Sequence, residues 1–226
     1  MVSRVLTALG DDLRAALSRG AAATPSRPPG GEVWLGVLAL LALVTGLATL
    51  AAGGYHGGFL TINAWASGHP DWVWQWLTCL GDERVPFALA LFIARHRPRV
   101  FWALILAALA ATAYSRGLKP LFDMPRPPAV LEPGSFHLNG PSHRRLAFPS
   151  GHSVTAGVFF AVLIYFARRT GTRALLALLA TLAGLSRVAV GVHWPVDVAF
   201  GLFGGLGAAW ICLLYTSDAA DDEYNV

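Results

Sequence analysis

The chain has 226 residues and a formal net charge of +4, with 55% apolar and only 13% charged residues. An ordinary soluble domain carries about 25% charged residues. This composition disfavours a disordered chain, a coiled coil and a nucleic-acid-binding domain, so no nucleic-acid partner is expected. A membrane protein is the leading class.

Residues 1–32 are predicted to form a cytoplasmic N-terminal segment and linker. They contain four arginines and no apolar run long enough for a signal peptide. Apolar residues recur near helical spacing from Val2 to Leu17, which predicts either a short amphipathic helix on the membrane surface or an unstructured tail. Prolines and glycines between Ala21 and Glu32 end any such helix.

Six apolar segments follow and predict an all-α bundle of six transmembrane helices over residues 33–211. The first, Val33–Ala52, has 20 residues without a charge, and at about 1.5 Å per residue it covers a hydrocarbon core of roughly 30 Å. The other segments are Val85–Ala94 (extended back toward Asp71), Val100–Tyr114, Gly151–Ala167, Ala174–Val192 and Val196–Ile211.

The second segment is interrupted by the charged run Gly81–Arg84. Asp71–Leu80 is either a separate interfacial helix, suited to the membrane surface by Trp72, Trp74 and Trp76, or part of one tilted helix whose charges face the bundle interior. We favour the single tilted helix.

Basic residues between the segments predict the orientation. Four arginines precede the first segment, three follow the second and three follow the fourth, which places these parts in the cytoplasm of a multi-pass membrane protein. Residues 53–70 contain no lysine or arginine and are expected outside. The connection between the third and fourth segments is also expected outside, yet it carries Lys119, Arg126, Arg144 and Arg145. Bound anions would explain these outer cations.

Three clusters on this outer side carry residues suited to phosphate chemistry: Lys119–Pro127, Pro149–His152 and Ser186–Asp197. Arginine can chelate two phosphate oxygens and lysine supplies a point charge. Ser150 and Gly151 open a helix, so their backbone N–H groups and the helix dipole can point at an anion. Taken alone, each residue has a structural explanation, since arginines often snorkel to headgroups and Ser150 can simply cap its helix.

His193 and Asp197 are four residues apart, which on a helix places them on one face. The carboxylate can then accept from one ring nitrogen and leave the other nitrogen able to attack phosphorus. His152, on a different helix, can protonate the leaving oxygen. Asp197 lies in an apolar stretch, where a carboxylate is costly and usually functional.

Together, Lys-x6-Arg-Pro, Pro-Ser-Gly-His and Ser-Arg-x5-His-x3-Asp resemble the complete three-part signature of the type 2 phosphatidic acid phosphatase superfamily. The resemblance covers about Trp72–Ile211. It implies a six-helix phosphatase of the bacterial plasma membrane whose active site faces the periplasm or exterior. It also implies that no metal or other cofactor is needed. The signature also occurs in soluble bacterial acid phosphatases and vanadium haloperoxidases, but six apolar segments argue against both.

By motif position, the resemblance implies a role for each site residue. His193 would be the nucleophile that forms a phosphohistidine, Asp197 its orienting partner and His152 the general acid. The residues that would hold the phosphate oxygens and stabilise the five-coordinate transition state are Lys119, Arg126, Ser150, Gly151 and Arg187.

The substrate is expected to be a phosphorylated membrane lipid. Bacterial members that look like this act on undecaprenyl diphosphate, phosphatidylglycerophosphate or related lipids, and some act on lipid A. We favour a lipid phosphate or diphosphate phosphatase, with a lipid A phosphatase or phosphotransferase as the alternative. A non-catalytic protein that binds anionic lipid is an alternative of another class, against which His152, His193 and Asp197 weigh. Four loop residues either contact a second phosphate or headgroup or are simply solvated: His137, His143, Arg144 and Arg145.

Residues 212–226 do not fit this pattern. Their first eleven residues resemble the translation of a transposon-based sequencing adapter, so we expect a non-native segment and a truncated sixth helix. Val196–Ile211 has 16 residues, about 24 Å of helix, which is short of a core of roughly 30 Å. The alternative is an ordinary acidic cytoplasmic tail.

Overall fold

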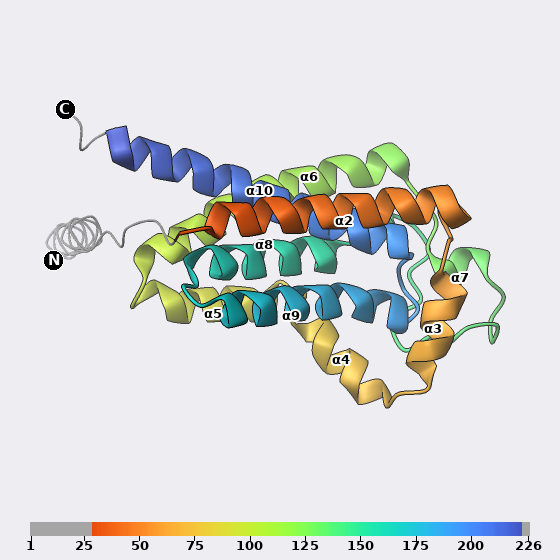
Figure 1. Ribbon diagram of the computed structural model, residues 1–226. Helices are drawn as coiled ribbons and strands as arrows, with labels where there is room; N and C mark the ends of the chain where they lie inside the picture. The colour runs from red at the N-terminus through yellow and green to blue at the C-terminus, as the bar shows by residue number, and fades with distance from the viewer. Residues whose placement is uncertain (1–28, 223–226) are drawn as a thin grey trace, which may run out of the picture.

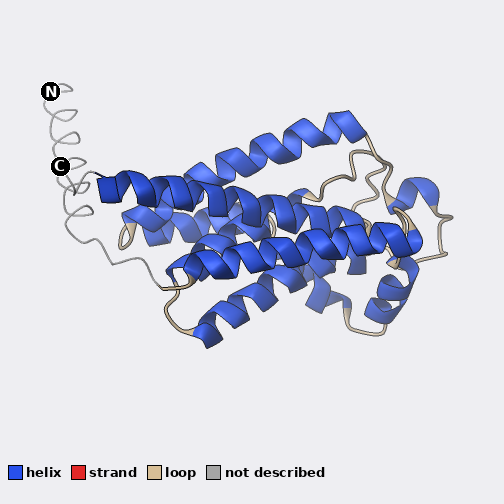
Figure 2. Ribbon diagram, turned by 45° about the horizontal axis from the view of Figure 1, so that its top comes forward, coloured by secondary structure: helices blue, strands red, loops and turns tan. Residues whose placement is uncertain are grey.

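The computed structural model describes the backbone of residues 29–222 and the side chains of residues 29–214. The described residues form helices joined by loops, as expected for an all-α protein, and Figures 1 and 2 show their arrangement. The helices are α2 (Gly31–Gly53), α3 (Phe59–Ser67), α4 (Asp71–Cys79), α5 (Arg84–Ala94), α6 (Pro98–Phe122), α7 (Pro127–Val130), α8 (Gly151–Phe166), α9 (Thr170–Ala189) and α10 (Pro195–Asp222).

The long helices pack side by side around α8 and α10. Helix α10 contacts α2, α6, α8 and α9, and α8 is buried along most of its length. Four stretches are long and apolar enough to cross a membrane, namely Gly31–Gly53, Pro98–Val130, Thr170–Ala189 and Pro195–Leu214, and two shorter apolar helices are α5 and α8. The chain is therefore a multi-pass membrane protein. A count of six spans depends on the two short helices.

Glycines bring the first turns of α8 and α10 into contact. A Cβ added to Gly201 of α10 would lie 2.7 Å from the Ser150 carbonyl oxygen and 2.8 Å from Ser153 Cβ. One turn further on, the backbone of Gly205 packs directly on the Val154 carbonyl. Larger side chains would separate the helices, so these glycines place Ser150 beside the start of α10.

The two ends of the bundle differ in structure. Helices α3, α4 and α7 lie at one end with the 131–150 loop (Figure 1). The start of α2 and the α5–α6 and α8–α9 connections lie at the opposite end. The described arginine-rich connections that were predicted to be cytoplasmic therefore share one end of the bundle.

The prediction of one tilted helix from Asp71 to Ala94 is wrong. Helix α4 ends at Cys79 and α5 begins at Arg84, and Figure 1 shows α4 running at an angle to α5. Helix α4 packs on α9. The turn forms because Gly81 packs against the start of α8, where an added Cβ would lie 2.7 Å from the His152 carbonyl oxygen. The alternative of a separate helix at Asp71–Leu80 agrees with α4, which ends one residue earlier.

Most residues of the two predicted terminal segments have no described side chains. Residues 1–28, which include the predicted amphipathic helix, lie outside the described part of the chain. The backbone of α10 continues to Asp222 and so includes residues 212–222 of the segment predicted to come from an adapter.

Candidate active site

His193 and Asp197 form a buried pair at the start of α10. His193 Nδ1 and Asp197 Oδ2 are 3.2 Å apart, and the two side chains are 2% and 0% exposed. The prediction that both lie on one face of a helix is wrong, because α10 begins at Pro195 and His193 lies in the preceding turn. The pair forms because the same Asp197 Oδ2 accepts the backbone N–H of Trp194 at 2.9 Å. That contact ends the turn and brings the carboxylate back to the His193 ring.

The other carboxylate oxygen of Asp197 is bound by a residue with no place in the sequence motifs. The Tyr55 hydroxyl, from the turn between α2 and α3, donates to Asp197 Oδ1. The Tyr55 ring lies 6.4 Å from the Trp194 ring and 6.5 Å from the Phe148 ring, measured between centroids. The turn between α2 and α3 therefore covers the histidine–carboxylate pair.

The second motif opens α8 as expected from the sequence. Ser150 is the N-cap residue of α8, and its Oγ accepts the Ser153 backbone N–H at 3.4 Å and the Ser153 hydroxyl at 3.0 Å. The Ser150 backbone N–H donates to the Asp197 carbonyl at 3.0 Å. The N-terminus of α8, which favours anions, is thus tied to the start of α10.

Lys119 and Arg126 converge on one carbonyl of the loop that precedes α8. Lys119 Nζ, in the last turn of α6, donates to Leu146 O at 2.9 Å. Arg126 Nη2 approaches the same oxygen at 3.4 Å, and Arg126 Nε donates to Arg145 O at 2.9 Å. The loop bonds back in turn, since the Ala147 N–H donates to Met124 O at 2.9 Å. The loop therefore holds the two cations together.

Arg187 enters the site from α9 and is 7% exposed. Its Nη1 donates to Thr78 Oγ1 of α4 at 2.6 Å. Its Nε is buried and has no hydrogen-bond partner among the described residues. An arginine held by one hydroxyl, with a buried donor still to be satisfied, is suited to bind a phosphate oxygen.

The surrounding charges favour a neutral His193. Burial, followed by the charges of Arg126 and Arg187, lowers the pKa of His193 well below its ordinary value. Lys119 and His152 act in the same direction. Neutral imidazole is the form that can act as a nucleophile.

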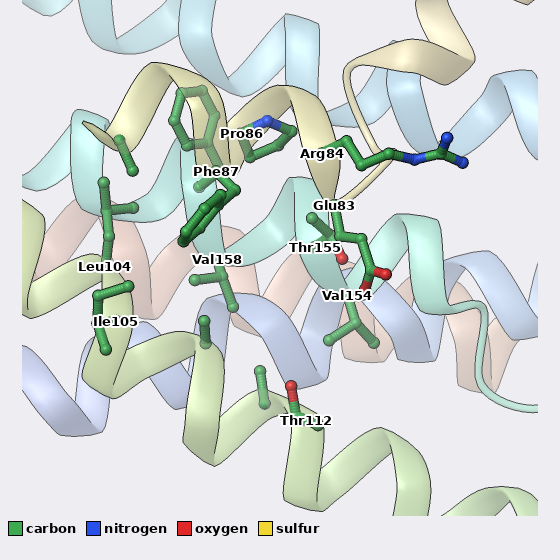
Figure 3. A pocket seen from close by; sticks show the side chains of 14 residues that line it. Glu83, Arg84, Pro86, Phe87, Leu104, Ile105, Thr112, Val154, Thr155 and Val158 are labelled. Atoms are coloured by element: carbon green, nitrogen blue, oxygen red, sulfur yellow. The ribbon is translucent and has the colours of Figure 1, made fainter. Parts of the chain in front are cut away.

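Two adjoining cavities open beside this cluster. A polar cavity of about 500 Å³ is lined by Lys119, His152 and Asp82. The Arg84 backbone N–H donates to Asp82 and holds the pKa of that carboxyl below its ordinary value. An apolar cavity of about 430 Å³ lies between α5, α6 and α8 and shares Glu83 and Thr155 with the polar one. Figure 3 shows Glu83 at the polar part of this apolar cavity.

Four loop residues were expected either to contact a second phosphate or headgroup or to be solvated, and three of them bond to other parts of the protein. His137 Nε2 lies 2.7 Å from Asp71 Oδ1 of α4, and Arg145 pairs with Asp123. The Arg144 carbonyl accepts the Arg126 backbone N–H at 3.0 Å. These contacts dock the loop onto the rest of the site.

Sequence reasoning missed the residues that support the motifs. Tyr55 and Thr78 contact motif side chains directly, while Trp194 Nε1 donates to Pro125 O at 2.8 Å and joins the third motif to the first. Asn63 of α3 donates to Val188 O and Ala189 O at 3.2 and 3.1 Å, which holds the end of α9. Only Trp194 lies inside a motif. No spacing rule would have pointed to the other three.

The chain is similar to two curated proteins. The chain is 33% identical to a lipid A 1-phosphatase of Rhizobium johnstonii over 129 residues, which is 56% of this chain and 49% of that protein. It is also 33% identical over 130 residues to a lipid A 1-phosphatase of Rhizobium etli, covering 56% of this chain and 52% of that protein. The chain thus spans about half the length of the curated relatives it matches.

Two solved structures resemble the fold. The crystal structure of Aquifex aeolicus LpxE matches with a TM-score of 0.64 and 33% identity, covering 70% of this chain and 93% of that one. A transmembrane PAP2-type phosphatidylglycerolphosphate phosphatase from Bacillus subtilis matches in fold, with a TM-score of 0.59 and 19% identity over 81% of this chain and 96% of that one. The family model of the PAP2 superfamily, the type 2 phosphatidic acid phosphatases, matches residues 100–221. Because this match covers more than half of the chain, including all three motifs, the chain belongs to the PAP2 superfamily.

Proposed function

We propose that this protein is a membrane lipid phosphatase that works through a phosphohistidine on His193. The observation that carries the proposal is the buried His193–Asp197 pair beside three cationic side chains. One of these cations, Lys119, lines the polar cavity that adjoins the apolar one. An anion-binding protein needs the cations, but it has no use for a neutral histidine held by a carboxylate.

In the first step, His193 Nε2 attacks phosphorus while Nδ1–H stays bonded to Asp197. A P–N bond forms and the P–O bond to the lipid breaks, with its electron pair going to the leaving oxygen. His152 donates a proton to that oxygen. In the second step, neutral His152 takes a proton from water, the resulting hydroxide displaces His193, and inorganic phosphate leaves. No metal takes part in the proposed steps.

The phosphate oxygens would be held by the residues that converge on the site. Lys119, Arg126 and Arg187 would neutralise the charge that grows on the equatorial oxygens. The Ser150 side chain and the Gly151 N–H at the start of α8 would add helix-terminal donors. These cations are already arranged by bonds to Leu146 O and Thr78 Oγ1, so little reorganisation is needed at the transition state.

We also propose that six helices cross the membrane and that the site faces the periplasm or exterior. The short α5 and α8 would cross with the four longer spans. The arginine-rich α5–α6 and α8–α9 connections lie at the end of the bundle opposite the site (Figure 1). The positive-inside rule assigns that opposite end to the cytoplasm.

The substrate class follows from the paired cavities. The polar cavity would hold the phosphate and the headgroup, and the apolar cavity between α5, α6 and α8 would hold the start of an acyl or prenyl chain. We keep a lipid phosphate or diphosphate as the general substrate. The second candidate is lipid A, because the two curated relatives are lipid A 1-phosphatases at 33% identity.

The test is phosphate release from purified protein in detergent micelles containing chelator. The panel holds undecaprenyl diphosphate, phosphatidylglycerophosphate, phosphatidic acid and lipid A. We expect release from at least one lipid, and loss of at least about a thousandfold in the His193→Ala variant. Preference for lipid A would select the second candidate.

Two outcomes would contradict the proposal. Equal turnover in wild type and His193→Ala would exclude the histidine mechanism. Lipid binding without release from any member of the panel would instead select the non-catalytic alternative. Acid-labile labelling of wild type, but not of His193→Ala, by a ³²P-labelled substrate would detect the phosphohistidine.

A further inference from the structure

Asp197 has two carboxylate oxygens, and each has a separate partner at the site. Oδ2 accepts from His193 Nδ1 and from the Trp194 backbone N–H. Oδ1 accepts from the Tyr55 hydroxyl, which reaches it from the turn between α2 and α3. A carboxylate bonded on one oxygen alone can rotate about its bond to Cβ. A donor on the second oxygen fixes the plane of the group and therefore the direction of the His193 ring.

Packing fixes the position of Tyr55. Its ring lies against Trp194 and Phe148, and Trp194 in turn stacks on His56 at 4.0 Å with an interplanar angle of 26°. The neighbouring Phe59 ring meets the Trp194 ring edge-on at 4.9 Å. The hydroxyl therefore points at Asp197 with little freedom, and little further conformational entropy is lost when it donates its hydrogen bond.

Tyr55 is also held in the form that donates a proton. Burial, followed by the negative charge of Asp197, raises the pKa of Tyr55 above its ordinary value. The hydroxyl therefore stays protonated across the physiological range. Its hydrogen bond draws negative charge from the carboxylate, which leaves less charge to stabilise a protonated His193.

From this geometry we infer that Tyr55 is a positioning residue of the active site, which orients Asp197 and thereby sets the direction and basicity of the His193 ring. This inference rests on the proposed function for its kinetic consequence. The structural consequence does not depend on the proposed function, because the effect of Tyr55 on the His193 ring exists without substrate. The three residues form a hydrogen-bonded chain. The Tyr55 hydroxyl donates to Asp197 Oδ1, and His193 Nδ1 donates to Asp197 Oδ2.

The expected effect of Tyr55→Phe has a defined sign. The variant keeps the ring that packs on Trp194 and removes only the donor to Asp197. The carboxylate then carries more negative charge toward His193, so the His193 pKa rises and the acid limb of the kcat/KM profile moves to higher pH, by roughly half a pH unit to one unit. Looser orientation should lower kcat about tenfold with a smaller change in KM.

The pH profile must be read with every charged group that faces His193. Besides Asp197 and Tyr55, these are Lys119 and Arg126 from the first motif, His152 from α8 and Arg187 from α9. Lysine and the arginines keep their charge across the acid limb. His152 lies close to His193 and can also titrate, so the kinetic acid limb alone does not identify the group. The His193 pKa is therefore measured directly by ¹⁵N-histidine NMR, and its resonance is assigned as the one lost in His193→Gln.

Tyr114→Phe is the matched control. The Tyr114 hydroxyl donates to the Phe200 carbonyl at 3.0 Å, so the control also removes one hydroxyl hydrogen bond between a tyrosine and α10. It lies outside the Asp197 pair. The control should leave the His193 pKa and the acid limb unchanged, whatever it does to stability.

A second variant tests the sign. Site-specific 3-fluorotyrosine at position 55 is a stronger donor than tyrosine and should lower the His193 pKa, in the direction opposite to Tyr55→Phe. A positional or folding defect would not produce opposite shifts. An unchanged His193 pKa in Tyr55→Phe, or the same shift in Tyr114→Phe, would overturn the inference.

The two proposals fail separately. A wild-type protein that releases no phosphate would end the proposed function, while the NMR titration without substrate would still decide the role of Tyr55. A wild-type phosphatase whose Tyr55→Phe variant keeps its acid limb and its His193 pKa would end the inference alone.

Discussion

Helix α9 carries one buried arginine near each end, and the two are bound in different ways. Arg173, 4% exposed, donates from Nε to Ala167 O at 2.9 Å and from Nη1 to Pro29 O at 3.1 Å. Arg187, 7% exposed, donates from Nη1 to the Thr78 hydroxyl and lies among the cations that face His193. Arg173 thus ties backbone segments together, whereas Arg187 lies in the proposed phosphate site. Each arginine has one buried donor without a hydrogen-bond partner among the described residues, Nη2 of Arg173 and Nε of Arg187, so an unpaired donor does not separate the two. Burial of an arginine does not by itself reveal which role it has.

The largest expected effect separates the two arginines by activity. Arg187→Ala should lower kcat/KM about 100- to 1000-fold, because one preorganised donor to the transition state is lost. Phosphate release from the best lipid of the panel measures this effect. A loss of less than threefold would remove Arg187 from the proposed phosphate site.

Arg173→Ala should show the opposite pattern. Loss of its bonds to two carbonyls should lower the free energy of unfolding by about 3 kcal/mol. The kcat/KM per folded molecule should stay at the wild-type value. Thermal unfolding in detergent, followed alongside activity, checks both, and a selective loss of activity at unchanged stability would reverse the assignment.

A smaller effect is expected where α4 supports Arg187. Thr78→Val removes the acceptor of Arg187 Nη1 while keeping the shape of the side chain, and should lower kcat/KM about tenfold. Thr78→Ser keeps the hydroxyl and serves as the control, with activity close to wild type. Equal losses in both variants would point to packing of α4 instead of the hydrogen bond.

A further effect is the pH dependence of stability at the site. Because burial lowers the pKa of His193, the unfolded chain binds a proton below pH of about 6.5 that the folded protein does not bind. The free energy of unfolding should therefore fall by up to about 1.4 kcal/mol for each pH unit below that value.

Unfolding measured between about pH 7 and pH 5 tests this slope. His193→Gln should make the slope shallower, whereas Arg173→Ala should keep it although it lowers stability overall. An identical slope in wild type and His193→Gln would show that other groups carry the acid response.

Much of the fold could be predicted because the bilayer constrains it strongly. Apolar runs must form helices that bond their own backbone, so α2, α6, α8, α9 and α10 lie where the hydropathy predicts them. The sequence offered a break at Gly81 only as the less favoured alternative. The choice depends on the packing of Gly81 against the His152 backbone, a contact distant in sequence.

The three motifs were also readable in advance, and the fold brings their side chains to one end of the bundle. The residues that hold the motif side chains in place could not be predicted from the sequence. Tyr55 and Thr78 are ordinary residues in segments without a motif, and only the packing of the α2–α3 turn and α4 directs them at Asp197 and Arg187. The spacing of His193 and Asp197 was read as a helix face, yet a capping contact at Trp194 produces the pair.

The sequence by itself determined the class of the protein, its long apolar helices, its family and the residues available for phosphate chemistry. Apolar run length and motif spacing are local properties. Only the tertiary structure decided how those residues act together. Three features depend on contacts between distant segments: which carbonyl holds Lys119 and Arg126, which hydroxyl meets Asp197, and which arginine of α9 lies near His193. Such contacts arise from packing of the whole bundle, and no local pattern in the chain encodes them.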